Sequence, residues 1–260
     1  MSESQYLEMN RDGWDLRTEA HFESDFYDVD GFLAGNTSLR EIEQAELCDV
    51  RGKRLLHLQC HFGLDTLSWT REGAICTGVD LSPAAIGRAK ELAIRAGLEA
   101  EFICSDICAF ERSGSQPYDI VFTSYGAVCW ISDLERWADI ISTNLAIGGT
   151  FYMAEFHPVY DLLAGYSYFS RLEPDVEEEA SYTENASEIV AEFAVWAHPF
   201  TDVVNALIGA GIRIDRLNEF PFSPYNCFEG LEEREPGRFY LAHGGHDAPL
   251  VYSVTGTKIA

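Results

Sequence analysis

Asp80 directly follows the apolar run Ala74–Val79, which predicts a buried strand. A carboxylate that closes such a strand can accept hydrogen bonds from both hydroxyls of a ribose. The alternative is a turn or helix-capping aspartate, which the strand and helix pattern around Asp80 makes the weaker interpretation. Asp80 therefore predicts a nucleoside site, but its placement is shared by dinucleotide enzymes and by proteins that bind other adenosine ligands.

The glycine content of the preceding turn separates these ligands. The turn runs from Gln59 to Gly63, and Gly63 is its only glycine. A pyrophosphate must approach the backbone at a helix N-terminus, which is why dinucleotide sites need several glycines at fixed intervals. Gln59 and His61 place side chains where that approach would occur. The turn favours an adenosine ligand without a diphosphate, and it disfavours a dinucleotide oxidoreductase.

A second group of residues could move protons. Glu155 and His157 lie two positions apart at the end of the predicted strand Phe151–Phe156, so we expect both to point to one face. Their alternative role is that of a polar strand terminus bonded to loops. His198 and Glu219, near later strands, are weaker candidates for contacts to a substrate.

His57, Cys60 and His61 could suggest a metal ion, because three nitrogen or sulfur ligands lie within a short stretch. They begin in a strand, alternate between its sides and lack a second cluster that would complete four ligands. We expect no metal.

Strands and helices alternate from Arg54 onward, which predicts a parallel sheet. Ser82 and Pro83 mark the start of one helix and Gly97 its end. The pattern predicts an α/β fold with a doubly wound, mostly parallel seven-stranded sheet and helices on both faces. The expected strands are Leu55–Leu58, Ala74–Val79, Glu101–Ser105, Tyr118–Ser124, Phe151–Phe156, Ile212–Phe220 and Pro249–Thr257, and the expected helices include Leu64–Arg71, one from Leu134 to Leu145 and Asp202–Ala210.

Two segments do not follow this alternation. Residues 1–50 are aromatic and acidic, and we interpret them as an N-terminal helical flap over the crevice. Residues 158–198 are too long for a plain connection and predict an insertion after strand five. Residues 51–260 form the predicted Rossmann-like domain, and this insertion lies within it.

The run Leu55–Ser82 resembles the opening of a class I S-adenosylmethionine-dependent methyltransferase, and the whole chain resembles a bacterial small-molecule branch of that family. The likeness covers about residues 54–155. His57 stands where the family commonly has an acid, and Gln59 and His61 stand where it has glycine. The resemblance implies S-adenosylmethionine as cofactor, with contacts from Tyr27, Gln59, His61, Gly63, Asp80, Leu81, Asp106, Ile107 and Ser124.

The resemblance also implies the reaction, which is transfer of a methyl group to O, N or C of a small organic molecule. Tyr125 joins Glu155 and His157 as an expected catalytic residue, and Trp130 and His198 are expected to contact the substrate. Aromatic residues of the insertion could line the acceptor pocket or form a private core. The alternatives are a non-catalytic module that keeps an adenosine site and, less favoured, a dinucleotide oxidoreductase.

Composition limits the partners. Among 260 residues, 18 Lys and Arg stand against 43 Asp and Glu, for a formal net charge of −25. Such a chain repels phosphate backbones and anionic lipids, so we expect neither nucleic acid nor a membrane as partner. The seven scattered cysteines suit reduced thiols and no secretory signal is visible, which together predict a cytoplasmic protein. The expected partner is the small-molecule acceptor that the resemblance implies, and the expected state is a monomer or homodimer.

Overall fold

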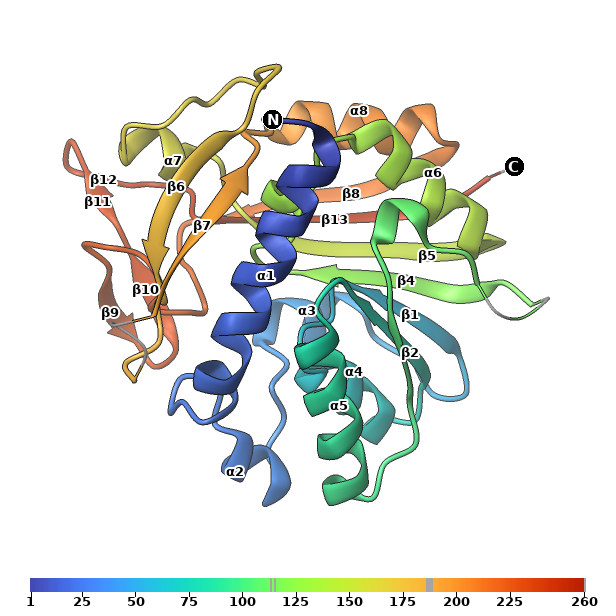
Figure 1. The fold of residues 1–260 in the computed structure, drawn as a ribbon. Coiled ribbons are helices and arrows are strands. Elements are labelled where there is room, and N and C mark those ends of the chain that lie inside the picture. Colours follow the sequence, from blue (N-terminus) through green and yellow to red (C-terminus); the bar gives the residue numbers. More distant parts are fainter. Residues whose placement is uncertain (113, 115, 186–188, 260) are drawn as a thin grey trace.

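A seven-stranded sheet forms the centre of the protein in a computed structural model, which describes residues 1–112, 114, 116–185 and 189–259 (Figure 1). Its strand order is β3-β2-β1-β4-β5-β13-β8. The first five are parallel to one another, whereas β13 is antiparallel to both β5 and β8. The strands are β1 (Arg54–Leu58), β2 (Ile75–Asp80), β3 (Glu101–Cys104), β4 (Tyr118–Ser124), β5 (Leu145–Phe156), β8 (Ile212–Phe220) and β13 (Val251–Lys258).

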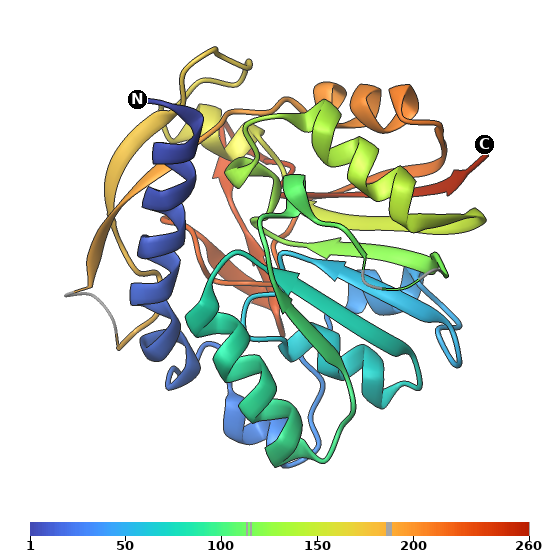
Figure 2. The ribbon, with the colours of Figure 1, turned by 45° about the vertical axis from the view of Figure 1, so that its right-hand side comes forward.

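Helices cover both faces of the sheet, as the sequence predicted (Figure 2). On one face the apolar side chains of α6 and α8 pack with Leu56 and Leu58 of β1. On the other face lie α3, α4 and α5, and the alternate residue Leu55 packs there. These helices are α3 (Glu41–Glu46), α4 (Leu64–Arg71), α5 (Pro83–Ala96), α6 (Leu134–Asn144) and α8 (Phe200–Gly209).

Local sequence signals account for the helix ends next to the crevice. The Ser82 hydroxyl accepts a hydrogen bond from the Ala85 N–H at the start of α5, Pro83 is the first helical residue, and Gly97 ends the helix in the left-handed region. Asp133 caps α6 in the same way, through the N–H of Arg136. These caps fix where each helix begins behind its strand, and they confirm the predicted bounds of α5.

Two parts of the fold differ from the expectation. β5 begins at Leu145 rather than at Phe151, and its pairing with β4 has a register irregularity. Gly148 lies in this early part of the strand and has a φ of 78°, in the left-handed region that favours glycine. Residues 221–248, for which the sequence predicted no elements, contain two small hairpins. These are β9 (Glu232–Glu235) with β10 (Arg238–Tyr240), and β11 (Ala242–His243) with β12 (His246–Asp247).

The N-terminal segment divides into two parts with different surroundings. Its first part forms α1 (Glu3–Phe22) and α2 (Val29–Leu33), and α1 lies beside the hairpin of the insertion (Figure 1). Its second part, from Leu39 through α3 to Val50, packs into the sheet core with Leu55. α2 also packs into the core, because its Val29 and Phe32 are buried with residues of α4 and α5. The description as a flap therefore suits only α1, while α2 and α3 belong to the layers of the sheet.

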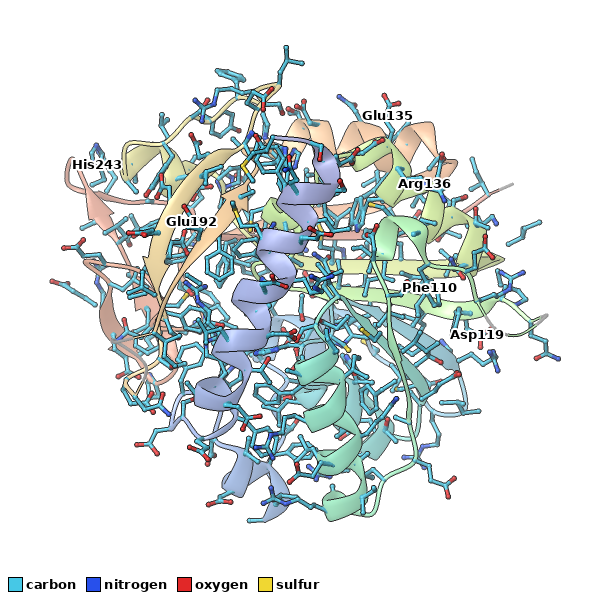
Figure 3. All side chains as sticks on the ribbon, in the orientation of Figure 1. Phe110, Asp119, Glu135, Arg136, Glu192 and His243 are labelled. Carbon is cyan, nitrogen blue, oxygen red and sulfur yellow. The ribbon has the colours of Figure 1, made fainter. Side chains whose placement is uncertain are left out.

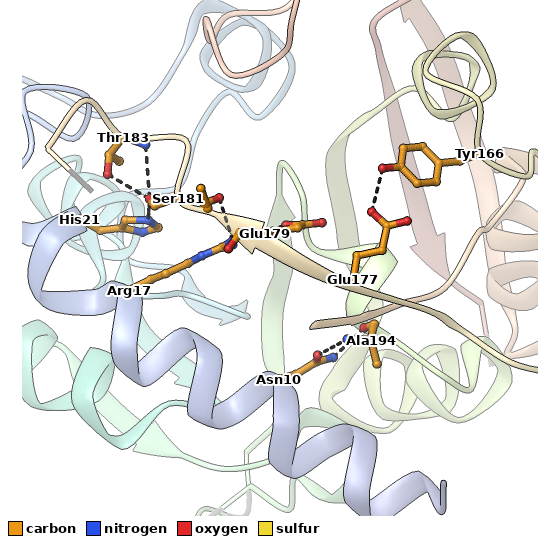
Figure 4. Close-up of polar contacts among 10 residues, drawn as sticks. Asn10, Arg17, His21, Tyr166, Glu177, Glu179, Ser181, Thr183 and Ala194 are labelled. Atoms are coloured by element: carbon orange, nitrogen blue, oxygen red, sulfur yellow. Dashed lines mark hydrogen bonds and ion pairs between the residues drawn. The ribbon is translucent and has the colours of Figure 1, made fainter. Parts of the chain in front are cut away.

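The insertion after β5 contains α7 (Val159–Leu163) and an antiparallel hairpin of β6 (Asp175–Ala180) and β7 (Val190–Val195). The side chains of Asn10 and Arg17 in α1 dock on this hairpin (Figure 4). The Asn10 amide pairs with both the N–H and the carbonyl of Ala194, at 2.8 and 2.9 Å. Arg17 donates to the Ala180 carbonyl at 3.0 Å and lies over the Phe193 ring, and Gly13 packs closely on the same ring.

Gly13 gives a test of this docking. A Cβ at Gly13 would lie 2.5 Å from the Phe193 ring, so Gly13→Ala is expected to destabilise the protein by about 1–3 kcal/mol, although alanine is the better helix former. The matched control is Gly87→Ala in α5, where a Cβ meets nothing within 4 Å, and which should stabilise by about 0.5–1 kcal/mol. Urea denaturation measures both values. If Gly13→Ala also stabilises, α1 does not pack on Phe193 in this way.

Charged side chains lie on the outside of this fold. Asp119, Glu135, Arg136 and Glu192 are exposed, whereas Phe110 is buried (Figure 3). The excess of acid is thus solvated at these positions. Among the described residues, no helix has the length and apolar character needed to cross a membrane.

Candidate active site

One cavity of about 830 Å³ brings most of the predicted site residues together. We call it the central cavity. Its walls come from the carboxyl ends of β1, β2 and β4, from α1 and from the insertion. It is lined by Tyr27, Gln59, His61, Gly63, Asp80, Leu81, Asp106, Ile107, Ser124, Tyr125, Trp130, Glu155 and His198, whereas His157 lies outside it.

Asp80 is held in place by the two turns beside it. One carboxylate oxygen accepts the His61 N–H at 2.7 Å, and the other accepts the Ser82 N–H at 2.9 Å. Each oxygen keeps a further lone pair for a ligand. Burial raises the pKa of Asp80 to about 6, against the opposing effect of these backbone hydrogen bonds.

Asp106 and Ile107 follow β3 in the neighbouring position. One Asp106 oxygen accepts the Cys108 N–H at 2.9 Å, which caps a short 3-10 helix, Ile107–Ala109. The Ile107 side chain is buried and lines the central cavity next to Leu81. A polar acceptor and an apolar surface therefore lie side by side, which suits a flat heterocycle with an amino group.

Two residues of the turn after β1 that are not glycine have a backbone conformation that favours glycine. Gln59 and His61 have φ of 57° and 49°, in the left-handed region that favours glycine. Gly63 has φ of 80°, and a Cβ there would lie 2.6 Å from Phe102. Gln59 and His61 therefore have a strained backbone close to Asp80. Such strain is common at ligand sites.

His61 is part of a buried polar chain that sequence reasoning did not find. Its Nε2 lies 3.0 Å from Nδ1 of His21 in α1, and Nε2 of His21 lies 2.8 Å from the Ser181 hydroxyl (Figure 4). Burial lowers the pKa of His21 to about 3 and that of His61 well below its usual value, so both rings are neutral. The chain joins the first turn, α1 and the insertion.

Asp65, at the start of α4, organises the side of the cavity near β4. It accepts hydrogen bonds from the hydroxyls of Ser38, at 2.6 Å, and Ser124, at 3.1 Å. Nearby, Nε2 of His57 and Oε1 of Gln59 are buried without a partner among the described residues. Asp65 was not predicted, and its place two residues after the only glycine of the turn is the one signal that could have indicated it.

Tyr125 does not present a free hydroxyl to the cavity. Its O–H donates to Glu43 of α3 at 2.8 Å. Glu43 is fully buried, and desolvation together with the charge of Asp65 raises its pKa to about 8. This pairing favours a structural role for Tyr125 over the expected catalytic one.

Replacing Glu43 tests its titration. The folded protein holds the Glu43 proton more tightly than the unfolded chain, so stability is lost as pH rises from about 4.5 towards 8. Glu43→Gln removes that loss and is expected to be more stable than the wild type by about 2 kcal/mol at pH 8, with little difference near pH 4.5. Thermal unfolding across this range measures the effect.

Glu41→Gln on the same helix is the control. Arg238 lies 2.7 Å from Glu41 and lowers its pKa, so this substitution should give at most a small loss of stability at neutral pH. A destabilised Glu43→Gln protein at pH 8 would contradict the buried, protonated state.

Glu155 is saturated with backbone donors. Its carboxylate accepts the N–H groups of Gly126, Ala127, Val128 and Phe156, and those from Ala127 and Val128 are at 2.8 and 2.9 Å. Two donors on each oxygen occupy all four lone-pair sites. No site remains for a substrate proton, so the geometry assigns Glu155 to holding the loop after β4 rather than to the expected role of base.

His157 and His198 differ in their relation to the cavity. His157 lies outside it, because the chain turns after Phe156, and its ring nitrogens contact Glu219 at 3.0 Å and the Val159 N–H at 3.1 Å. The expected catalytic role of His157 does not agree with this placement. His198 lines the cavity and donates through Nε2 to the Ile131 carbonyl at 2.7 Å, which leaves Nδ1 as an acceptor.

Trp130 and Tyr27 close the cavity from two sides. The Trp130 indole N–H donates to the Gly126 carbonyl, and its ring meets Trp14 of α1 at 5.4 Å between centroids. The Tyr27 hydroxyl bonds that of Tyr182 in the insertion. Among the described residues, no group of His, Cys, Asp and Glu side chains is arranged to hold a metal ion.

Comparison with known proteins agrees with this geometry. Residues 55–149 match a family model described as a methyltransferase domain. No curated protein is significantly similar to the chain in sequence. The match runs from β1 to the start of β5, which is the part of the sheet that carries Asp80 and Asp106.

Solved structures share the fold at low sequence identity. An S-adenosylmethionine-dependent methyltransferase from Mesorhizobium loti has 20% identity and a TM-score of 0.56 over 86% of this chain and 99% of its own. One from Clostridium acetobutylicum has 14% identity and a TM-score of 0.59, over 93% and 95%. Magnesium protoporphyrin IX methyltransferase from Synechocystis, with bound S-adenosylhomocysteine, has 12% identity and a TM-score of 0.51, over 94% and 99%. The chain therefore carries a methyltransferase domain over residues 55–149, and as a whole it has the fold of S-adenosylmethionine-dependent methyltransferases.

Proposed function

We propose that the protein transfers a methyl group from S-adenosylmethionine to a small organic molecule bound in the central cavity. One observation carries the proposal. A single cavity contains Asp80, the carboxylate expected to bind a ribose. The same cavity continues past β4 to aromatic walls supplied by the insertion. Its volume of about 830 Å³ lies within the range of sites for small molecules and has room for more than the cofactor alone.

The residues present fit the cofactor. Asp80 would hold the ribose hydroxyls, and Asp106 with Ile107 and Leu81 would hold the adenine. Buried polar atoms without a partner are rare, so Oε1 of Gln59 and Nε2 of His57 favour a polar ligand group at the methionine end. Tyr27, His61, Gly63 and Ser124 complete this wall as proposed contacts.

The bound cofactor supplies an electrophilic methyl group. The protein's contribution is to orient the acceptor and to exclude water. Glu155 fixes the loop Gly126–Val128, and that loop positions Trp130 over the cavity. Trp130 and His198 are the proposed contacts to the acceptor, and the α1 helix covers the cavity beside them.

Calorimetry with two ligands tests the cofactor. S-adenosylhomocysteine is expected to bind, and NAD is expected not to, because the side chains of Gln59 and His61 occupy the path of a diphosphate. Binding of NAD alone would overturn the proposal. Turnover is then measured as formation of S-adenosylhomocysteine with a panel of small acceptors. Silence across a broad panel, despite tight cofactor binding, would favour a non-catalytic adenosine-binding module.

A further inference from the structure

Part of the central cavity lies beyond the end of β5 and away from the residues assigned to the nucleoside. We call it the acceptor chamber and define it by Cys129, Phe156, Pro158, Asp161 and Phe228, all of which line the cavity. Asp161 belongs to α7, the first element of the insertion. The sequence analysis did not single it out.

The walls of the acceptor chamber are aromatic. Phe228 stacks on Tyr160 with 4.1 Å between ring centroids and meets the edge of Phe156 at 4.7 Å. Phe156 also contacts Tyr125, with 5.7 Å between centroids. Such surfaces accommodate an apolar or planar group, and their faces attract cations.

The charge around the chamber is negative. Glu155, Asp161 and Glu179 line the same cavity as Cys129. Burial raises the pKa of the Cys129 thiol, and the charges of these three carboxylates raise it further. Of the residues that the structure describes, two arginines line the central cavity, and both are engaged with other groups. Arg17 donates to Glu179 and to the Ala180 carbonyl and lies over Phe193, and Arg40 lies over the Tyr225 ring.

The three carboxylates differ in whether they are free to bind a ligand. Glu155 is saturated by backbone N–H groups, and Glu179 faces Arg17 at 3.4 Å. The Asp161 carboxylate has no hydrogen-bond or ion-pair partner within the part of the chain that the structure describes. It is accessible from the cavity, so a ligand can reach it.

We propose that the acceptor is an amine that is positively charged at neutral pH, and that Asp161 binds its ammonium group and takes up its proton. This inference rests on the proposed function, because it places the amine in the cavity that holds the cofactor. The aromatic walls take the apolar part of the molecule. Asp161 therefore determines which acceptors are methylated.

The proton balance of the reaction agrees with this role. The ammonium N–H bond breaks and its proton passes to the Asp161 carboxylate, which frees the nitrogen lone pair. That lone pair forms the N–C bond while the S–C bond breaks and leaves its electron pair on sulfur. Surrounding protein and the charge of Glu155 raise the pKa of Asp161 to about 6, which brings it closer to that of a base acting at neutral pH.

Three probes that differ in charge test the proposal on the unmodified protein loaded with S-adenosylhomocysteine. They are 2-phenylethylamine, 2-phenylethanol and phenylacetate, which are a cation, a neutral molecule and an anion of similar size. Ligand-observed NMR titration is expected to show that the amine binds at least about tenfold more tightly than either of the others. Equal affinities, tighter binding of phenylacetate, or no binding by any probe would overturn the proposal.

Two variants then assign the preference to one residue. Asp161→Asn should remove the preference for the amine while leaving the affinity for S-adenosylhomocysteine unchanged. Glu178→Gln in β6, an exposed acid outside the cavity, should keep the preference. An Asp161→Asn protein that still prefers the amine would overturn the role of Asp161. Failure of the wild type to bind S-adenosylhomocysteine would instead contradict the proposed function.

Discussion

Replacing Asp80 with alanine is expected to weaken binding of S-adenosylhomocysteine by about 2–3 kcal/mol, or roughly 30- to 150-fold. The substitution removes a charged acceptor for two ribose hydroxyls. It also leaves the N–H groups of His61 and Ser82 without their acceptor, so the first turn loses its anchor. Isothermal titration calorimetry measures the affinity, and circular dichroism verifies the fold.

Asp80→Asn separates these two effects. Asparagine keeps one oxygen for a backbone N–H and lacks the charge, so we expect a smaller loss of affinity than with alanine. An unchanged affinity in both variants, with the fold intact, would show that the ribose lies elsewhere.

Glu155→Gln is expected to destabilise the protein by about 3 kcal/mol. The amide NH₂ would face two backbone N–H donors that now bond a carboxylate oxygen, so two buried donors would lose their acceptor. Denaturation by urea gives the free energy of unfolding. A residue that only took a substrate proton would leave stability near that of the wild type, so this measurement distinguishes the two roles of Glu155.

Glu219→Gln is the matched control. Glu219 lies on β8 near the same end of the sheet, is largely exposed and bonds only the His157 ring among the described residues. Its replacement should change stability by less than about 0.5 kcal/mol. A Glu155→Gln protein as stable as this control would contradict the saturated carboxylate.

Structural features that depend only on residues close together in the sequence could be predicted. Ser82, Pro83 and Gly97 set the ends of α5 through capping and backbone conformation, which depend on neighbouring residues alone. The alternation of strands and helices predicted the sheet. Asp80 was placed correctly at the carboxyl end of a strand, because β2 ends at this residue.

The roles of individual site residues depended on contacts that local patterns do not contain. Glu155 and His157 are two apart, yet the strand ends at Phe156, so the rule of alternating faces does not extend to His157. Three of the four donors that saturate Glu155 come from a loop nearly 30 residues earlier in the chain. Asp161 lies in an insertion without periodic signals, and only the folded cavity shows that it faces the acceptor chamber.

The backbone of the loop after β1 could not be predicted from local sequence patterns either. Its side chains indicated that glycine had been lost, but the backbone at Gln59 and His61 retains the left-handed conformation that glycine adopts readily. Tertiary contacts compensate for this cost, including the bond from the His61 ring to His21.

Trp14 of α1 couples three segments that are distant in the sequence. Its ring lies within 5.3 to 6.1 Å of the rings of His61, Trp130 and Phe193. These residues belong to the first turn, the segment after β4 and the hairpin of the insertion. A shift of α1 would therefore displace all three segments together, because they share this one aromatic contact.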